Sequence, residues 1–338
     1  MENKAEISKL LSSPKDVVIF SHRNPDGDAL GSSLALCHYL TGIHHSVKII
    51  FPSEYPIIFT WMPGSDKVLV YDLSPNECIA AIKQANLIFC LDFSSLDRID
   101  KMGEFVNQQT CPKIIIDHHL DPEPFADYII SDTSASSTCE MIFDFISDLH
   151  GKEKITEEIA ACIYTGIVTD TGSFKYSTSP AVFRKVADLL EAGVNDVLLQ
   201  NLIHNRLQEK YLRLLGYCLY EKMEIMPEVK TGLISLSRED YIKFDIQRGD
   251  TEGIVNYLLM LDNVDIAALI TEQPTIVKLS LRSKGDISVQ EICRDHFKGG
   301  GHKNASGGAV YGTLSQTVKK FKEVIPKYFK PNLSNISK

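Results

Sequence analysis

Acidic residues and histidines directly follow four apolar runs of this sequence, at 17–20, 87–91, 113–116 and 160–169. In open α/β sheets ligands bind at the carboxyl ends of the strands, because loops and helix N-termini converge there. A single aspartate in such a place could simply cap a turn, but four matching ends indicate a metal site. The residues concerned are His22, Asp26 and Asp28, then Asp92, then Asp117, His118 and His119, and finally Asp170.

So many carboxylates at one sheet edge would repel one another unless cations were bound there. The number of ligands predicts two divalent ions. Oxygen-rich ligation with a histidine at each ion suits Mn²⁺ better than Mg²⁺, whereas zinc sites are normally richer in cysteine or histidine. Mg²⁺ and Co²⁺ remain the alternatives. The expected ligands are His22 and Asp26 for one ion, Asp28, His118 and Asp170 for the other, and Asp92 as the bridge.

A pair of divalent ions about 3.5–4 Å apart lowers the pKa of bound water and holds the attacking and leaving oxygens of an in-line displacement. Phosphoester hydrolysis is the reaction that uses all of this. The sequence contains no G-x-x-x-x-G-K-[ST] motif, so a P-loop is not indicated. We expect Asp117 and His119 to support the ligands from behind or to face a phosphate, with Asp117 orienting a ligand histidine. The expected catalytic residues are Asp92, Asp117, His118 and His119.

Composition places limits on the substrate and the compartment. Hydrophobic content of 44% and charged content of 23% are ordinary for a soluble globular protein. The net charge of −9, without any block of like charges, argues against binding of long DNA or RNA. The eight cysteines form no C-x-x-C pair, and no apolar run approaches the roughly 18 residues of a membrane span. We therefore expect a cytoplasmic enzyme with no membrane association and a short substrate.

The order of predicted elements indicates two α/β domains. Strands at 16–21, 46–51, 68–71, 86–91, 113–117 and 127–131 alternate with helices at 28–41, 75–85 and 96–107, which predicts a doubly wound, mainly parallel sheet. Helices follow at 155–169 and 180–192, and Ser137-Thr138-Cys139-Glu140 fits a capping box at the start of another. We place the catalytic domain at 1–194. A helical linker at 195–220 follows, interrupted only by Gly216.

A second, smaller α/β domain is expected at 221–338, with strands at 224–229, 232–237, 264–272 and 275–282 and helices at 250–261, 288–296 and 314–329. Its most distinctive stretch, 298–308, contains five glycines, which argues against a helix or strand interior. A flexible surface loop is one interpretation. We favour an anion-binding loop, because His302 and Lys303 lie within it and exposed backbone N–H groups form anion sites.

The ordered set of motifs resembles the DHH phosphoesterase superfamily with its DHH-associated C-terminal domain. The motifs are His22-x-x-x-Asp26-x-Asp28, Asp92, Asp117-His118-His119, Asp170-Thr171-Gly172, Arg282 and Gly299-Gly300-Gly301-His302-x-x-Ala305-x-Gly307. In size the chain resembles the NrnA type of bifunctional oligoribonuclease. The resemblance implies manganese-dependent hydrolysis in the first domain and substrate binding by the second. The residues that it implies for substrate binding are Arg282, Gly299, Gly300, Gly301, His302 and Asn304.

The substrates that the resemblance implies are short oligoribonucleotides, cleaved to nucleoside 5′-monophosphates, and 3′-phosphoadenosine 5′-phosphate (pAp), cleaved to AMP. Several alternatives stay open: cyclic di-AMP, linear dinucleotides, an exopolyphosphatase-related activity, and a catalytically inactive nucleotide-binding regulator. Assembly as a homodimer is also left open.

Overall fold

The computed structural model of the chain describes residues 3–205, 208–247 and 249–329. The chain forms two compact units, residues 1–206 and 207–338. The division falls inside the predicted linker at 195–220, so that α8 (Asp196–His204) belongs to unit 1 and α9 (Glu209–Tyr217) to unit 2. No helix of the described residues is long and apolar enough to cross a membrane.

The expectation that only Gly216 interrupts this linker is wrong. Gly216 lies inside α9, and no atom stands within 4 Å of the position that a Cβ would take there. A glycine in an open helix position costs only about 1 kcal/mol, which the rest of the helix tolerates. The interruption instead follows α8, which ends at His204 with Asn205 as its C-cap, and the predicted linker residues 206–207 lie outside the described residues.

Unit 1 is built on a six-stranded sheet in the order β3-β2-β1-β4-β5-β6, with every neighbouring pair parallel. This confirms the predicted doubly wound sheet. The strands alternate buried side chains between two faces, because both faces are covered by helices. The strands are β1 Asp16–Phe20, β2 Ser46–Phe51, β3 Leu69–Val70, β4 Leu87–Leu91, β5 Lys113–Asp117 and β6 Tyr128–Ser131.

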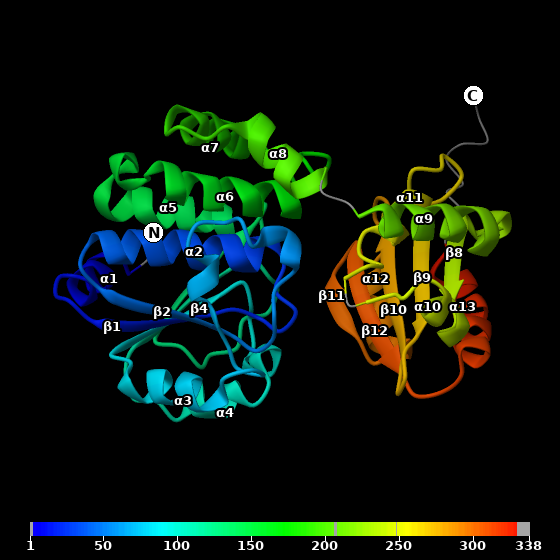
Figure 1. Cartoon of the computed structure of the whole chain (residues 1–338), viewed down its shortest axis with the longest axis horizontal. Helices are drawn as coiled ribbons and strands as arrows, with labels where there is room; N and C mark the ends of the chain where they lie inside the picture. Colours follow the sequence, from blue (N-terminus) through cyan, green and yellow to red (C-terminus); the bar gives the residue numbers. More distant parts are fainter. Residues whose placement is uncertain (1–2, 206–207, 248, 330–338) are drawn as a thin grey trace. The chain divides into compact units, whose positions relative to one another are not determined.

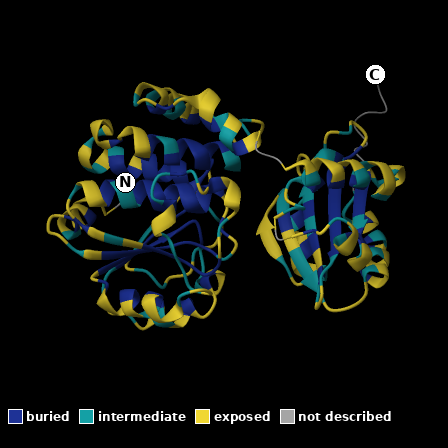
Figure 2. Ribbon diagram, in the orientation of Figure 1, coloured by how far each residue is buried: buried dark blue, intermediate teal, exposed yellow. Residues whose placement is uncertain are grey.

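Helices form the outer layers of unit 1 (Figure 1). α2, α5 and α6 cover one face, α3 and α4 cover the other, and α7 and α8 pack outside α5 and α6 (Figure 1). The dark interior in Figure 2 follows the sheet and the helices next to it. The helices are α1 Lys4–Leu10, α2 Gly27–Gly42, α3 Pro75–Gln84, α4 Met102–Asn107, α5 Thr138–His150, α6 Glu157–Asp170 and α7 Pro180–Glu191, with a short 3₁₀ turn, η3, at Leu96–Ile99.

Three glycines bring α2 and α6 together. A Cβ on Gly31 would lie 2.6 Å from the Cys162 carbonyl oxygen, and one on Gly166 would lie 2.2 Å from Cys139 Sγ and 2.8 Å from an Asp28 carboxylate oxygen. A Cβ on Gly27, at the first turn of α2, would clash with Thr169 in the same way. The two helices therefore touch almost backbone to backbone, which places the start of α2 beside the end of α6.

Unit 2 contains a mixed six-stranded sheet in the order β11-β12-β10-β9-β8-β7. α12 and α13 pack on one face, while α9 and α11 pack on the other (Figure 1). The second α/β domain is thereby confirmed in fold class. The elements are β7 Met223–Met226, β8 Thr231–Leu236, α10 Arg238–Lys243, α11 Ile254–Leu258, β9 Ile266–Glu272, β10 Val277–Ser283, α12 Val289–His296, β11 Gly300–His302, β12 Ala305–Val310 and α13 Leu314–Tyr328.

The glycine-rich stretch is not a loop, which corrects the prediction from sequence. It forms the antiparallel hairpin of β11 and β12, with Gly300 opposite Gly307. The glycines are needed because backbones pass very close to one another. A Cβ on Gly299 would lie 1.9 Å from the Gly307 carbonyl oxygen, and Gly301 adopts a φ of 136°, which L-residues rarely do.

Asp240 links α9 and α10 in unit 2 through a buried hydrogen-bond network. Its carboxylate accepts hydrogen bonds from Tyr217 Oη at 2.6 Å, Lys222 Nζ at 2.7 Å and the Ser237 backbone N–H at 2.8 Å. Burial alone would raise the pKa of Asp240, but Lys222 and the other donors lower it to about 2. The ionised carboxylate is therefore what the folded unit prefers.

Replacing Asp240 with Asn should destabilise unit 2 by about 2 kcal/mol at neutral pH, since its pKa lies nearly two units below the ordinary value. Because the folded-state pKa is lowered, this stabilisation is present above about pH 4 and is lost as pH falls toward 2. Urea unfolding of Asp240→Asn and of the exposed control Asp262→Asn at pH 7 and pH 3 measures it. Equal losses for the two variants at pH 7 would contradict the assignment.

Candidate metal centre

Asp92 lies in the middle of the acidic cluster at the carboxyl ends of the strands. Its Oδ2 is 3.3 Å from His22 Nε2, and its Oδ1 is 3.6 Å from His118 Nε2. Thr138 Oγ1 donates a hydrogen bond to Oδ1 at 3.0 Å. The φ of Asp92 is 63°, a conformation that is uncommon for non-glycine residues and is often found at functional sites. Each carboxylate oxygen thus faces a different imidazole.

His22 follows β1, and its ring is held in one orientation. Its Nδ1 lies 3.0 Å from the Arg23 carbonyl oxygen, which can only accept a hydrogen bond, so Nδ1 carries a proton and Nε2 faces Asp92. Burial lowers the pKa of His22, but the contact with Asp92 outweighs this and raises it to about 9. Asp26 is the N-cap of α2, where its Oδ1 accepts two backbone N–H groups.

The buried Asp28 is held by the N-terminus of α5. Its Oδ2 accepts the backbone N–H of Thr138 at 2.7 Å, and its Oδ1 accepts that of Cys139 at 2.8 Å. These are orphan donors of the first helical turn, where the helix dipole also favours a carboxylate. The Asp28 Oδ2 lies 3.9 Å from His118 Nε2.

Asp170 approaches His118 from the other side. Its Oδ2 is 3.3 Å from His118 Nε2. Asp170 is the last residue of α6, where the negative end of the helix dipole disfavours a lone carboxylate and favours a cation.

Asp117 and His119 form a pair beside this group. Asp117 Oδ1 lies 2.7 Å from His119 Nδ1, whereas the predicted ligand His118 contacts the Ala135 carbonyl at 3.4 Å through its Nδ1. Asp117 therefore orients His119. Its other carboxylate oxygen is buried and has no hydrogen-bond partner among the residues that the structure describes.

The electrostatics of the cluster require positive charge. Burial and the neighbouring carboxylates raise the pKa of Asp28 and of Asp170 well above the ordinary value. Burial acts in the same direction on Asp92, but its contacts with His22 prevail and lower its pKa. Protons on Asp28 and Asp170 thus relieve a repulsion that bound cations would relieve equally well.

Among the described residues of unit 1, three sets of donor atoms, each within 4.8 Å of one another, fit a divalent metal site. Asp92 belongs to all three. The first two sets contain five of the six predicted ligands. The sixth, Asp170, is in none of the three sets but lies 3.3 Å from His118 Nε2, and Asp117 belongs to the third set. The sets are His22, Asp26 and Asp92, then Asp28, Asp92 and His118, then Asp92, Asp117 and His119.

The sequence pattern did not reveal how α5 supports the cluster. Ser137 is the N-cap of α5 and accepts the Glu140 N–H at 3.1 Å, as predicted. A capping box also predicts that Glu140 accepts the backbone N–H of the N-cap, Ser137. This part of the prediction is wrong, because Glu140 Oε2 accepts the N–H of Ser136 at 2.7 Å. Thr138, with its two contacts to Asp28 and Asp92, was missed. The capping motif did mark Thr138 as the start of a helix. Its partners Asp28 and Asp92 lie far away in the sequence, so their contact with it could not be predicted.

The predicted substrate-binding residues of unit 2 lie around β10 and the hairpin. Arg282 is half-buried on β10, opposite Ala305 of β12, and its Nη1 donates to the Leu281 carbonyl at 3.1 Å. Asn304 has a structural contact, because its Nδ2 donates to Ser283 Oγ at 2.9 Å and to the Gly285 carbonyl at 3.0 Å. His302 is exposed at the end of β11.

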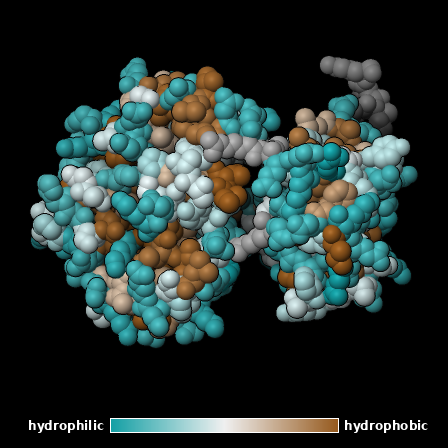
Figure 3. Space-filling view, viewed as in Figure 1, coloured by the Kyte–Doolittle hydropathy of each residue, from teal (hydrophilic) through white to brown (hydrophobic). Residues whose placement is uncertain are grey.

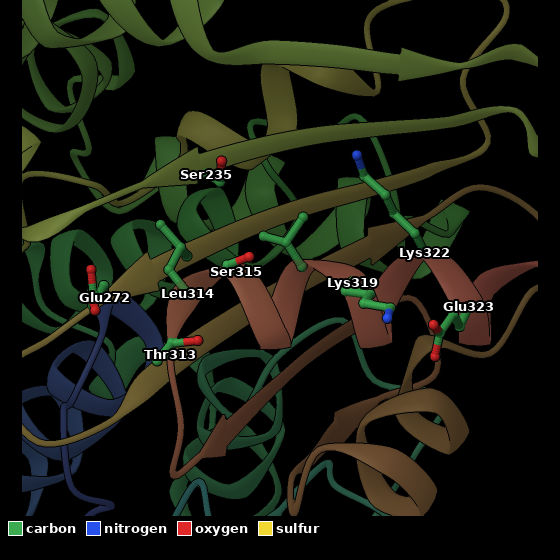
Figure 4. A pocket seen from close by; sticks show the side chains of 9 residues that line it. Ser235, Glu272, Thr313, Leu314, Ser315, Lys319, Lys322 and Glu323 are labelled. Carbon is green, nitrogen blue, oxygen red and sulfur yellow. The ribbon is translucent and has the colours of Figure 1, made fainter.

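A groove of about 750 Å³ opens elsewhere on unit 2, beside the first turns of α13 (Figure 4). Both signs of charge line it, from Lys319, Lys322, Glu272 and Glu323. None of the predicted substrate-binding residues contributes to its lining within the described part of the chain.

Comparisons with known proteins identify the family of the chain. Residues 16–167 match the model of the DHH family, N-terminal domain, and residues 234–330 match the DHHA1 domain. The chain is 30% identical to a probable bifunctional oligoribonuclease and PAP phosphatase NrnA from Streptococcus mutans, over 87% of this chain and 89% of that protein. The chain belongs to the DHH family. As a member of that family with these His/Asp clusters, it is a phosphoesterase.

Two further relatives align with this DHH-family protein over nearly its whole length. The bifunctional oligoribonuclease and PAP phosphatase NrnA of Thermus thermophilus is 28% identical over 95% of this chain and 92% of its own length. The crystal structure of an exopolyphosphatase-related protein from Bacteroides fragilis is 40% identical, covers 96% of both chains and superposes with a TM-score of 0.93.

Proposed function

We propose that this DHH phosphoesterase hydrolyses short oligoribonucleotides to nucleoside 5′-monophosphates and pAp to AMP, using water and two divalent ions, with Mn²⁺ preferred. The observation that carries the proposal is the position of Asp92, whose two carboxylate oxygens face His22 and His118 separately. A carboxylate in that position can bridge two ions.

The residues present fit such a pair of ions. When bound, the two ions would lower the pKa of a water molecule and stabilise negative charge on the attacking and leaving oxygens. His22, Asp26 and Asp92 would hold one, and Asp28, Asp92, His118 and Asp170 the other. The chain itself fixes these donors, through the Arg23 carbonyl on His22 and the α5 N–H groups on Asp28.

We propose that His119 acts on the substrate. Asp117 holds its Nδ1 at 2.7 Å, and burial, which lowers the pKa of His119, is outweighed by Asp117 and Asp92, so that the pKa is raised. A protonated imidazole beside the ions would contact an oxygen of the scissile phosphate. This is the role that we propose for the Asp117–His119 pair.

The substrate class rests on the relatives and on charge. The two NrnA proteins carry the oligoribonuclease and PAP phosphatase activities in their names. The net charge of −9 disfavours long polyanions, whether RNA or polyphosphate. Five of the six predicted ligands occur in the donor sets and Asp170 contacts His118, which argues against an inactive regulator.

Parallel assays with pAp, the linear dinucleotide pApA, cyclic di-AMP and polyphosphate, each with Mn²⁺, Mg²⁺ or Co²⁺, test the proposal. We expect pAp and pApA to give AMP at the highest efficiency, with Mn²⁺. Protein carrying Asp92→Asn, purified in parallel, controls for contaminating nucleases. Higher efficiency on cyclic di-AMP or polyphosphate would replace the proposed substrate, and binding without hydrolysis would favour a regulator.

Arg282→Ala should raise KM for pAp and pApA strongly, since a guanidinium is the side chain best suited to hold a phosphate. Steady-state kinetics with Mn²⁺ separate this from an effect on kcat. Arg238→Ala, at the first turn of α10, is the control for loss of an arginine from unit 2. Unchanged KM and kcat in Arg282→Ala would remove Arg282 from the substrate site.

A further inference from the structure

Arg23, the residue after His22, is bound to two other loops of unit 1. Its Nη1 and Nη2 donate to the two carboxylate oxygens of Asp72 at 2.9 and 3.0 Å, and its Nε donates to Asp100. Its backbone N–H donates to the Arg98 carbonyl at 2.8 Å. Asp72 follows β3, while Arg98 and Asp100 belong to the loop that begins at Asp92. One side chain therefore joins three loops at the carboxyl edge of the sheet.

Two further hydrogen bonds, both donated by backbone N–H groups, connect these loops to the loop that follows β2. The Asn24 N–H donates to Ser53 Oγ at 3.0 Å, in the loop that follows β2. The Asp72 N–H donates in turn to the Pro52 carbonyl at 3.2 Å. Hydrogen bonds thus connect the loops that follow β1, β2, β3 and β4. Arg23 contributes to the bonds with the loops after β3 and β4.

The same residue fixes the imidazole of His22. The Arg23 carbonyl oxygen accepts from His22 Nδ1 at 3.0 Å, which directs Nε2 toward Asp92. Groups that orient a ligand histidine in this way typically change metal affinity by about 10- to 100-fold when they are removed. The Arg23 peptide is held by its own N–H bond to the Arg98 carbonyl, and the guanidinium contacts with Asp72 and Asp100 tie the same residue to both neighbouring loops.

We infer that Arg23 is a positioning residue for the metal centre, acting through His22. The inference rests on the two-ion site of the proposed function. Arg23 and both its partners are partly exposed, and such ion pairs contribute little to stability. The bidentate contact to Asp72 instead defines an orientation, which a lysine could not reproduce.

The test compares Arg23→Ala and Arg23→Lys with the wild type by equilibrium dialysis of Mn²⁺ and by kinetics with pAp. We expect one of the two ions to bind about tenfold or more weakly in Arg23→Ala, and the other to bind as in the wild type. At limiting Mn²⁺ kcat should fall with little change in KM, and excess Mn²⁺ should restore it. Arg23→Lys should show the same defect in weaker form.

Two controls keep the outcomes distinct. Arg213→Ala removes an exposed arginine that pairs with Glu209, and should leave Mn²⁺ binding unchanged. If Arg23→Ala melts early, Asp72→Asn carries the same test with the backbone bonds intact. Mn²⁺ affinity like that of the wild type in these variants would overturn the inference. A wild type that binds two Mn²⁺ ions but hydrolyses none of the substrates would contradict the proposed function instead.

Discussion

Replacing Asp92 with Ala is expected to lower kcat by roughly a thousandfold or more, because metal-ion stabilisation is worth several kcal/mol and each 1.4 kcal/mol or so is a factor of ten. Asp92 lies between His22 and His118, and no neighbouring carboxylate belongs to all three donor sets. Turnover of pAp with Mn²⁺ and elemental analysis of the purified protein measure the effect.

A second substitution separates chemistry from folding. The φ of Asp92 is 63°, which alanine tolerates poorly and asparagine tolerates better. Asp92→Asn should therefore unfold at the wild-type temperature and still be inactive. Asp97→Ala, an exposed position in the same loop, should retain activity. Near-wild-type turnover in Asp92→Asn, or full activity of metal-free protein, would contradict the two-ion proposal.

On a ladder of 5′-phosphorylated RNA, hydrolysis is expected to be fastest for about two to five nucleotides and to fall steeply beyond that length. A longer strand would gain affinity only by neutralising more phosphates with Lys and Arg, and the chain has 35 of these against 44 Asp and Glu. Its surface should repel the added phosphates.

Rates on labelled RNA with Mn²⁺, measured at two salt concentrations, decide this. We expect a weak salt dependence of KM for the shortest substrates, because few phosphate contacts are made. Equal or rising efficiency at about twenty nucleotides, with a steep salt dependence, would indicate an outer binding surface and a processive RecJ-like exonuclease. In the view of Figure 3, the visible surface carries many hydrophilic residues, with hydrophobic residues between them.

The parts of the site that were predictable from sequence are those encoded locally. The buried runs before His22, Asp92 and Asp117 form neighbouring strands in the parallel sheet, so their carboxyl ends had to converge. The strand order places β1 beside β4, where the crossover direction reverses, and this is the usual ligand position of such sheets. Alternating apolar segments were enough to predict that arrangement.

What could not be predicted depends on contacts between distant residues. Asp28 is held by Thr138, 110 residues later, and Arg23 by Asp72, 49 residues later. The glycines at 299–308 were misread for the same reason. Glycine is needed at positions 299 and 301 because the backbone of the facing hairpin strand leaves no room for a Cβ, and no local sequence pattern reveals that contact. The helix 250–261 was also overestimated, since α11 spans only Ile254–Leu258, after Gly253 with a φ of 78°.

The close contact of α2 with α6 limits which ions the centre can adopt. Asp28 and Asp170 are carried by helices whose backbones meet at Gly31 and Gly166, so we expect the two carboxylates to keep their relative positions. Asp26, the N-cap of α2, and His22 precede the helix. A larger or smaller cation must therefore be accommodated on the loop side. Selectivity for ionic radius would be set there, and exchange of one metal for another should alter that half of the site first.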